Sequence, residues 1–159
     1  MLEPWIRPLR PGLRVAGLAS TVELAADDNL FMRRAIEAGP GPGPLLVVAG
    51  AERSRAAVMG GNVAAELAAR GFGAVIADGP VRDAAEILEL GLPVWSRGTT
   101  PVRPGKHGPG SLGQAVFCAG VLVRPGDLVA ADDDGIVVWP RERLQELLAA
   151  ARKLSLRQG

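Results

Sequence analysis

The sequence predicts an α/β fold in which a short parallel sheet is followed by antiparallel strands. Two apolar segments of strand length, at residues 45–49 and 73–78, are separated by helical sequence, as is typical of parallel strands joined by crossovers. Short strand-like segments at hairpin spacing then occupy residues 114–139. The 159 residues show no internal repeat and no domain boundary, so we expect residues 1–159 to form a single domain.

The N-terminal third predicts one strand and one helix. Residues 1–12 are punctuated by proline and predict irregular structure, whereas residues 13–22 alternate loosely and suit a strand. Either aspartate of the pair at 27–28 can cap a helix that runs to about Ala38. The run GPGPGP at 39–44 cannot be regular structure and predicts a turn or short linker.

Strands and helices alternate in the next segment. Ser54 can cap a helix that stops at Gly71, but the pair Gly60-Gly61 favours a break, with a new helix near Asn62. The other expected elements are strands at 45–49, 73–78 and 93–97 and a helix at 82–90, closed by Gly91. This alternation predicts a locally parallel sheet.

The sequence after residue 97 has a different texture. Residues 98–113 form a Gly/Pro loop too long to be a mere connector in a compact domain. Short strands are then expected at 114–119, 121–123, 127–131 and 136–139, with antiparallel pairing. A C-terminal helical segment, residues 141–159, is expected to hold a polar helix over 141–155.

Composition excludes several classes of chemistry. The chain has one His, one Cys and two Lys, which rules out a three-His zinc site, a zinc finger and a disulfide framework. Its 18 Lys+Arg against 17 Asp+Glu give a net charge of +1, so nucleic acid is not an expected partner. A single thiol, no signal-like N-terminus and no apolar run of spanning length predict a cytoplasmic protein without a membrane partner.

Several conspicuous residues are better explained by structure than by chemistry. No phosphate-binding glycine fingerprint is present, and the acids at 132–134 are consecutive, where a calcium loop needs alternate ones. These acids, followed by Gly135, predict a tight turn that tolerates a positive φ. Lys106 and Lys153 are expected to be solvated and Cys118 to be an inert core thiol, while His107 stays open as a catalytic base.

The segment from Asp78 to Asp83 is a stronger candidate. It follows a predicted buried strand, and ligands of open α/β sheets bind at the carboxyl ends of strands. Arg82 and Asp83 are expected in the first turn of the next helix, where an arginine is unfavourable unless an anion is bound. Backbone N–H groups of residues 60–63 can form a second anion cradle.

Four segments of the chain together resemble the RraA-like family. They are the run GGNV at 60–63, AARGFGAVIADGPVRD at 68–83, GLPV at 91–94 and VRPGDLVAADDDGIVVWP at 123–140. That family includes 4-hydroxy-4-methyl-2-oxoglutarate aldolases and the regulator of ribonuclease E activity A. The resemblance covers about residues 6–140 and implies a swivelling β/β/α fold, with mixed parallel and antiparallel sheets and flanking helices, assembled as a homotrimer or hexamer.

The resemblance also implies roles for particular residues. In the aldolases an Arg-Asp pair binds the substrate carboxylate and a divalent metal (Mg²⁺ or Mn²⁺), and these roles map onto Arg82 and Asp83 respectively. The loop that offers backbone amides to the small 2-keto acid maps onto Gly60, Gly61, Asn62 and Val63. The chemistry implied is retro-aldol cleavage to pyruvate, with oxaloacetate decarboxylation through the same pyruvate enolate.

One position departs from the aldolase pattern. Active aldolases carry an acid 21 positions before the arginine, and this chain has Gly61 there. Three functions therefore stay open: a metal-dependent lyase, a binding protein that regulates a ribonuclease, and a different metal-assisted reaction of a keto acid. Glu142 and Glu146 are the candidates for a contribution from the C-terminal region of a neighbouring subunit.

Overall fold

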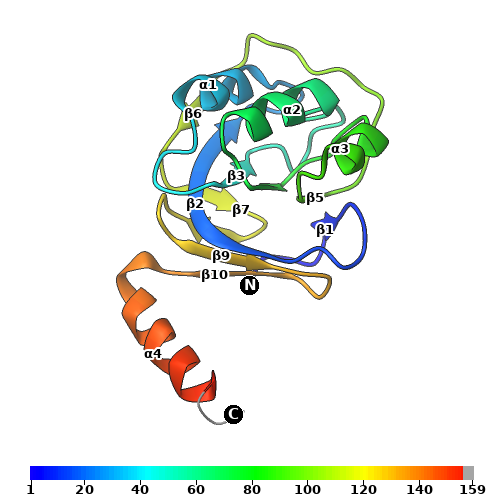
Figure 1. Cartoon of the computed structure of the whole chain (residues 1–159). Coiled ribbons are helices and arrows are strands. Elements are labelled where there is room, and N and C mark those ends of the chain that lie inside the picture. Colours follow the sequence, from blue (N-terminus) through cyan, green and yellow to red (C-terminus); the bar gives the residue numbers. More distant parts are fainter. Residues whose placement is uncertain (156–159) are drawn as a thin grey trace.

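The computed structural model describes residues 1–155, which form a curled mixed sheet with helices on its outer face (Figure 1). The sheet has eight strands in the order β1-β5-β4-β3-β2-β9-β10, with β6 paired to β2, and β7 and β8 form a separate hairpin. The first half of the chain contains β1 (Arg7–Pro8), β2 (Val15–Leu24), α1 (Leu30–Ala38), β3 (Leu45–Ala49), α2 (Gly61–Ala69), β4 (Ala74–Ala77), α3 (Ala84–Leu90) and β5 (Val94–Ser96). The second half contains β6 (Gly110–Leu112), β7 (Val116–Cys118), β8 (Val121–Val123), β9 (Leu128–Ala131), β10 (Ile136–Trp139), the 3-10 helix η1 (Arg141–Arg143) and α4 (Leu144–Ser155).

The predicted parallel and antiparallel pairings are both confirmed. Strands β2, β3, β4 and β5 are parallel neighbours, and β9 pairs with β10 and β7 with β8 in antiparallel hairpins. The long strand β2 joins the two regions, because its first residues pair with β9 and its later ones with β3. The result is the mixed α/β architecture that the sequence predicts.

Two apolar cores lie on opposite faces of the parallel strands. In β3, Leu46 and Val48 pack under the helices, while Leu45, Val47 and Ala49 face the core formed with the second half of the chain. All five residues are buried, which explains why this strand is apolar throughout rather than alternating. The parallel strands are therefore a fixed platform for the loops at their carboxyl ends.

One predicted helix start is confirmed and two are wrong. The new helix expected near Asn62, after the break at Gly60-Gly61, begins at Gly61 as α2, whereas the segment after Ser54 forms turns. The Ser54 hydroxyl does not cap a helix but accepts a hydrogen bond of 2.8 Å from the N–H of Asp27. Helix α3 begins at Ala84 rather than Arg82, because Asp83 has a left-handed backbone (φ 56°) that cannot continue a helix.

Other elements differ in smaller ways. The long loop contains a short strand, β6, and the N-terminal region contains β1. The turn at 132–135 uses no positive φ; instead the Asp132 carboxylate accepts hydrogen bonds from the N–H groups of Asp134 and Gly135. Helix α4 projects from the body (Figure 1) and buries none of its residues, while residues 156–159 of the predicted helical segment lie outside the described residues.

Within residues 1–155, no helix combines the length and the apolar character that crossing a membrane requires.

Candidate functional site

The two loops that the sequence singles out are in direct contact. One joins β3 to α2 and the other joins β4 to α3, so both leave the carboxyl ends of adjacent parallel strands. The N–H of Val58 donates to the carbonyl of Pro80 (2.9 Å), and the N–H of Arg82 donates to the carbonyl of Met59 (3.0 Å). These backbone bonds bring Gly60 beside Arg82 and Asp83, as the sequence predicts.

Arg82 and Asp83 lie before α3, not in its first turn. The unfavourable placement of an arginine at a helix N-terminus therefore does not arise. Asp83 adopts the left-handed conformation, which costs a residue with a Cβ about 1 kcal/mol or more and is found mostly where surrounding structure enforces it. Its carboxylate Oδ2 lies 3.7 Å from Nε of Arg82, and each side chain is 31% exposed, so both groups are open to a ligand.

Gly60 leaves space for this pair. Its backbone is extended, a conformation that any residue adopts, so its glycine character is explained by contact and not by φ. A Cβ at position 60 would lie 2.5 Å from Oδ2 of Asp83 and 2.9 Å from Nε of Arg82. The absent side chain is therefore what allows the backbone of one loop to approach the side chains of Arg82 and Asp83 on the other.

Of the remaining residues of the 60–63 loop, one contacts the pair formed by Arg82 and Asp83 directly and two line a cavity beside it. The N–H of Gly61 donates to Oδ2 of Asp83 (3.1 Å) and so fixes the orientation of this carboxylate. Asn62 and Val63 line an adjoining cavity of about 290 Å³, together with Gly60 and Arg82. The predicted cluster is thus assembled, although the Gly61 amide binds Asp83 in this structure.

Gly61 also contacts a carboxylate that sequence reasoning did not single out. A Cβ at position 61 would lie 2.2 Å from Oε2 of Glu86, on the first turn of α3. In the helix that the sequence predicts over residues 82–90, Glu86 would share a face with Asp83 three residues earlier, and this spacing could have signalled it. Glu86 therefore occupies the space that a side chain at position 61 would require.

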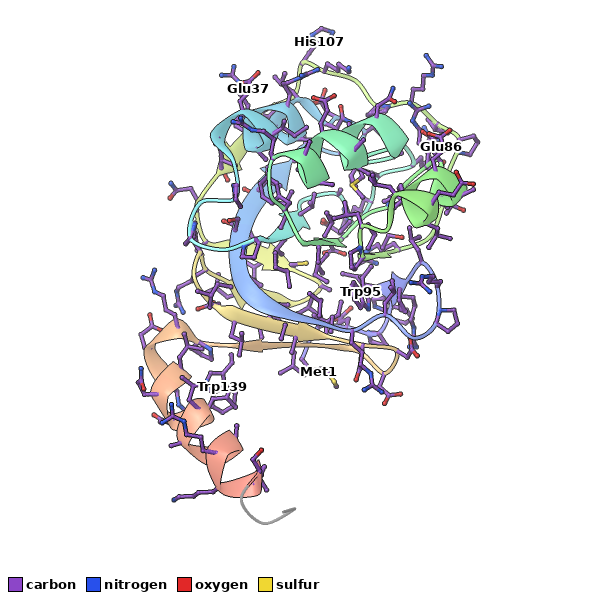
Figure 2. The ribbon with its side chains drawn as sticks, in the orientation of Figure 1. Met1, Glu37, Glu86, Trp95, His107 and Trp139 are labelled. Carbon is purple, nitrogen blue, oxygen red and sulfur yellow. The ribbon has the colours of Figure 1, made fainter. Side chains whose placement is uncertain are left out.

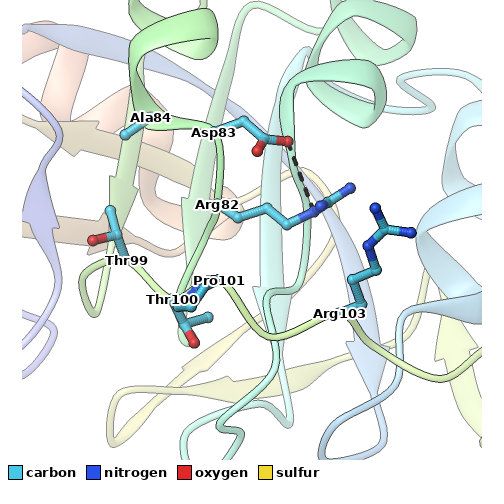
Figure 3. Close-up of a pocket in the computed structure, with 7 residues that line it drawn as sticks. All are labelled: Arg82, Asp83, Ala84, Thr99, Thr100, Pro101 and Arg103. Atoms are coloured by element: carbon cyan, nitrogen blue, oxygen red, sulfur yellow. Dashed lines mark ion pairs between the residues drawn. The ribbon is translucent and has the colours of Figure 1, made fainter.

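The long loop between β5 and β6 supplies the other wall of the site. Figure 3 shows the larger cavity, about 520 Å³, where this loop faces Arg82 and Asp83. The loop contributes Thr99, Thr100, Pro101 and Arg103. The length of this loop indicated that it is more than a connector, but nothing in its sequence identified Arg103.

The residues present fit a hard divalent cation that keeps most of its water. Asp83 offers a half-exposed carboxylate, and Glu86 lies close by across Gly61. Within residues 1–155 there is no group of three or more His, Cys, Asp or Glu side chains arranged to hold a metal ion. An all-protein cage is thus not formed there, whereas one or two carboxylates plus water and substrate oxygens is the coordination that Mg²⁺ commonly has.

The residues that the sequence assigned to structure lie apart from this cluster. Burial raises the pKa of the Cys118 thiol, as expected of an inert core residue. The His107 ring points outward at the tip of the long loop (Figure 2). Lys153 is exposed on α4, and Glu142 and Glu146 form ion pairs with Arg141 and Arg143.

Two other polar residues near the cluster are Lys106, which borders a cavity, and Asp78, which is buried and holds the structure together. Lys106 is exposed, yet it also lines the 290 Å³ cavity. Asp78, at the end of β4, is buried and forms an ion pair with Arg97, and its Oδ2 accepts a hydrogen bond from the N–H of Ala119 (2.7 Å). Asp78 therefore fastens the loop that carries Arg82 to the β7–β8 hairpin.

Two proteins similar to this chain in sequence carry the same provisional name. A protein of Halalkalibacterium halodurans, provisionally named a 4-hydroxy-4-methyl-2-oxoglutarate aldolase, is 34% identical over 93% of this chain and 70% of its own length. A Burkholderia multivorans protein with the same provisional name is 37% identical over 87% of this chain and 83% of its own.

Two solved structures of RraA-family proteins have the same fold as this chain. The RNA-processing inhibitor RraA of a Thermus species superposes with a TM-score of 0.77 at 31% identity, over 87% of this chain and 84% of its own. An unusual RraA-family protein of Streptomyces coelicolor, a family described as inhibiting a ribonuclease, gives 0.86 at 30% identity, over 99% and 81%. The sequence profile of the RraA-like family, described as Aldolase/RraA, matches residues 1–138, and the chain therefore belongs to the RraA-like family.

Proposed function

We propose that this protein is a divalent-metal-dependent lyase that cleaves 4-hydroxy-4-methyl-2-oxoglutarate-type substrates to pyruvate and also decarboxylates oxaloacetate. The observation that carries the proposal is the close approach of Gly60 to Arg82 and Asp83, which assembles a cation, a carboxylate and free space for a ligand. Relatives at 34–37% identity named as aldolases support the same reaction class. We further propose that the protein acts in the cytoplasm as a homotrimer or hexamer.

Each residue has a task that follows from its position. Arg82 binds the carboxylate of the 2-keto acid, because a guanidinium donates two parallel hydrogen bonds to a carboxylate. Asp83 holds the metal through its carboxylate, which the Gly61 N–H orients. When bound, Mg²⁺ or Mn²⁺ supplies Lewis-acid stabilisation of the negative charge that develops on the keto oxygen. Loop residues 60–63 and 99–103 enclose the substrate and limit the access of water.

The test is pyruvate release from 4-hydroxy-4-methyl-2-oxoglutarate and from oxaloacetate, with Mg²⁺ or Mn²⁺ and again after EDTA. We expect turnover of both substrates that EDTA abolishes and added metal restores. Absence of metal-dependent turnover above the background rate on both would overturn the proposal. Borohydride treatment with pyruvate should trap no adduct, and a covalent adduct on Lys106 would replace the metal mechanism by a Schiff base.

A second candidate function is regulation of a ribonuclease by direct binding. Gly61 favours it, because this chain lacks the acid that the active aldolases carry at that position. Solved relatives described as inhibitors of RNA processing and of a ribonuclease support it as well. Co-purification with the host ribonuclease, and inhibition of its RNA cleavage, would support this function, and no binding at micromolar concentrations of both proteins would exclude it.

A further inference from the structure

Arg103 lies next to Arg82 without a charged partner of its own. Both side chains line both cavities, and Figure 3 shows the two guanidinium groups extending into the same space. Among the ion pairs formed within residues 1–155, Arg82 has Asp83 as its partner and Arg103 has none. Two guanidinium groups that face one space repel each other unless an anion lies between them.

The cavity around these groups has an excess of positive charge although the chain is nearly neutral: Arg33 and Arg82 have carboxylate partners, and Arg103 and Lys106 form no ion pair within residues 1–155. The 290 Å³ cavity is lined by Arg33, Arg82, Arg103 and Lys106 and by a single acid, Glu66. Glu66 already forms an ion pair of 3.2 Å with Arg33. With a net charge of only +1 over 159 residues, this concentration of positive charge at one cavity favours an anionic ligand there.

The backbone on both sides of Arg103 is fixed. Before it, the carbonyl of Val102 accepts a hydrogen bond from Ala57 (3.0 Å). After it, Gly105 accepts from the N–H of Asn29 (3.0 Å) and donates to the carbonyl of Asp27 (2.8 Å). The side chain of Arg103 is exposed, while the backbone that carries it is held in place on both sides. Because this backbone is already ordered, less conformational entropy is lost when Arg103 binds a ligand.

We propose that Arg103 binds the distal carboxylate of a dicarboxylic 2-keto acid and so selects dianionic over monoanionic substrates. This rests on the proposed function, in which Arg82 binds the proximal carboxylate. One carboxylate can fill the hydrogen-bonding fork of Arg82, which leaves the fork of Arg103 free to bind a second carboxylate of the same ligand. The two cavities share Arg82 and Arg103, so an elongated acid can span them.

Binding tests the proposal without requiring turnover. The probes are 2-oxoglutarate and 2-oxopentanoate, which differ only in whether the chain ends in a carboxylate or a methyl group. Calorimetry with Mg²⁺ present should show that wild type prefers 2-oxoglutarate, and that Arg103→Met reduces this preference about 10- to 100-fold, as expected for a lost charge-assisted hydrogen bond. Arg103→Lys should retain part of it, and Arg34→Met, which removes an exposed arginine of α1 outside both cavities, should retain all of it.

Kinetics separate this proposal from the proposed function. For 4-hydroxy-4-methyl-2-oxoglutarate, Arg103→Met should raise KM with little change in kcat, whereas 4-hydroxy-4-methyl-2-oxopentanoate, which lacks the distal carboxylate, should be cleaved equally by both proteins. If wild type cleaves neither compound, the lyase function fails while the binding measurement still decides the role of Arg103. Equal affinity of wild type for the two probes, or a preference that survives in Arg103→Met, would overturn the assignment.

Discussion

Gly60 is the residue on which the site geometry depends most directly. A Cβ there would collide with Asp83 Oδ2 and with the Arg82 side chain, although the extended backbone tolerates any residue. Gly60→Ala should therefore displace both functional groups and lower kcat/KM about 100-fold, since shifts near 1 Å cost that much, while the melting temperature changes little. Steady-state pyruvate release and thermal unfolding of the same preparations check this, and an unchanged kcat/KM would show that the contact is not needed.

At Gly61 we expect a substitution to raise activity rather than lower it, because this glycine stands where active aldolases carry an acid. Gly61→Asp requires the Glu86 carboxylate to move, and Glu86 is flexible and exposed, so the variant should fold. We expect Gly61→Asp combined with Glu86→Ala to exceed wild type in kcat/KM for oxaloacetate, because the new carboxylate enters space that Glu86 vacates. Glu86→Ala alone is the control, and a double variant no faster than this control would show that the acid is not what limits the rate.

The Asp28 carboxylate, just before α1, holds the loop between β5 and β6 by accepting hydrogen bonds from its backbone N–H groups. We expect the strength of this attachment to depend on pH. Burial tends to raise the pKa of Asp28, but hydrogen bonds from the N–H groups of Leu30, His107 and Gly108 outweigh it and lower the pKa overall. A carboxylate with a lowered folded-state pKa contributes stability above its unfolded pKa, about 3.9, and loses it as the pH falls through the folded value.

Chemical unfolding at several pH values tests this attachment. The free energy of unfolding of Asp28→Asn should fall below that of wild type at pH 6, and the two should converge as the pH drops below about 4. Glu37→Gln, at an exposed carboxylate near the end of α1, is the matched control and should track wild type. A difference for Asp28→Asn that stays constant with pH would contradict the role assigned to its charge.

The elements show what sequence can and cannot predict. Strands β3 and β4 were predictable because burial on both faces makes their sequences apolar throughout, and adjacent parallel strands then bring their loops together. The break at Gly60-Gly61 was predictable, but the helical segment expected between Ser54 and that break does not form, because the Asp27 carboxylate accepts hydrogen bonds from the N–H groups of Arg55 and Ala56 and stabilises a turn instead. That contact links residues far apart in sequence, so no local pattern reveals it.

The arrangement of the candidate site was predictable only in part. The proximity of Arg82 and Asp83 to the 60–63 loop was predictable because both loops follow the ends of adjacent parallel strands. The left-handed backbone of Asp83 was not, because local propensity disfavours it and tertiary contacts impose it. Arg103 was missed because a cation in a long Gly/Pro loop has no sequence feature that fixes its neighbours.

At the level of the whole molecule, the exposed apolar residues of α4 bear on the proposed assembly. The helix buries no residue of its own, and Leu148 and Leu154 are 49% and 60% exposed. Under the proposed trimeric or hexameric assembly, we expect α4 to pack against a neighbouring copy, because an exposed apolar helix face gains stability by burial.

Deletion of residues 141–159 tests this expectation. The deletion should lower the molar mass of the assembly in sedimentation equilibrium by more than the mass removed, while cooperative thermal unfolding is retained because α4 contributes nothing to either core. A full-length protein that sediments as a monomer, or a deletion that keeps the same number of chains per assembly, would contradict the assignment.

The most direct measurement is metal-dependent pyruvate release by Asp83→Asn compared with wild type. This substitution keeps the size of the side chain and removes the charge that would hold the metal. We predict that the rate with saturating 4-hydroxy-4-methyl-2-oxoglutarate and Mg²⁺ falls about 100-fold or more, a typical loss for a group that stabilises developing charge. Asp134→Asn, in the exposed β9–β10 turn, should leave it unchanged. An Asp83→Asn enzyme as fast as wild type would contradict a site built on Arg82 and Asp83.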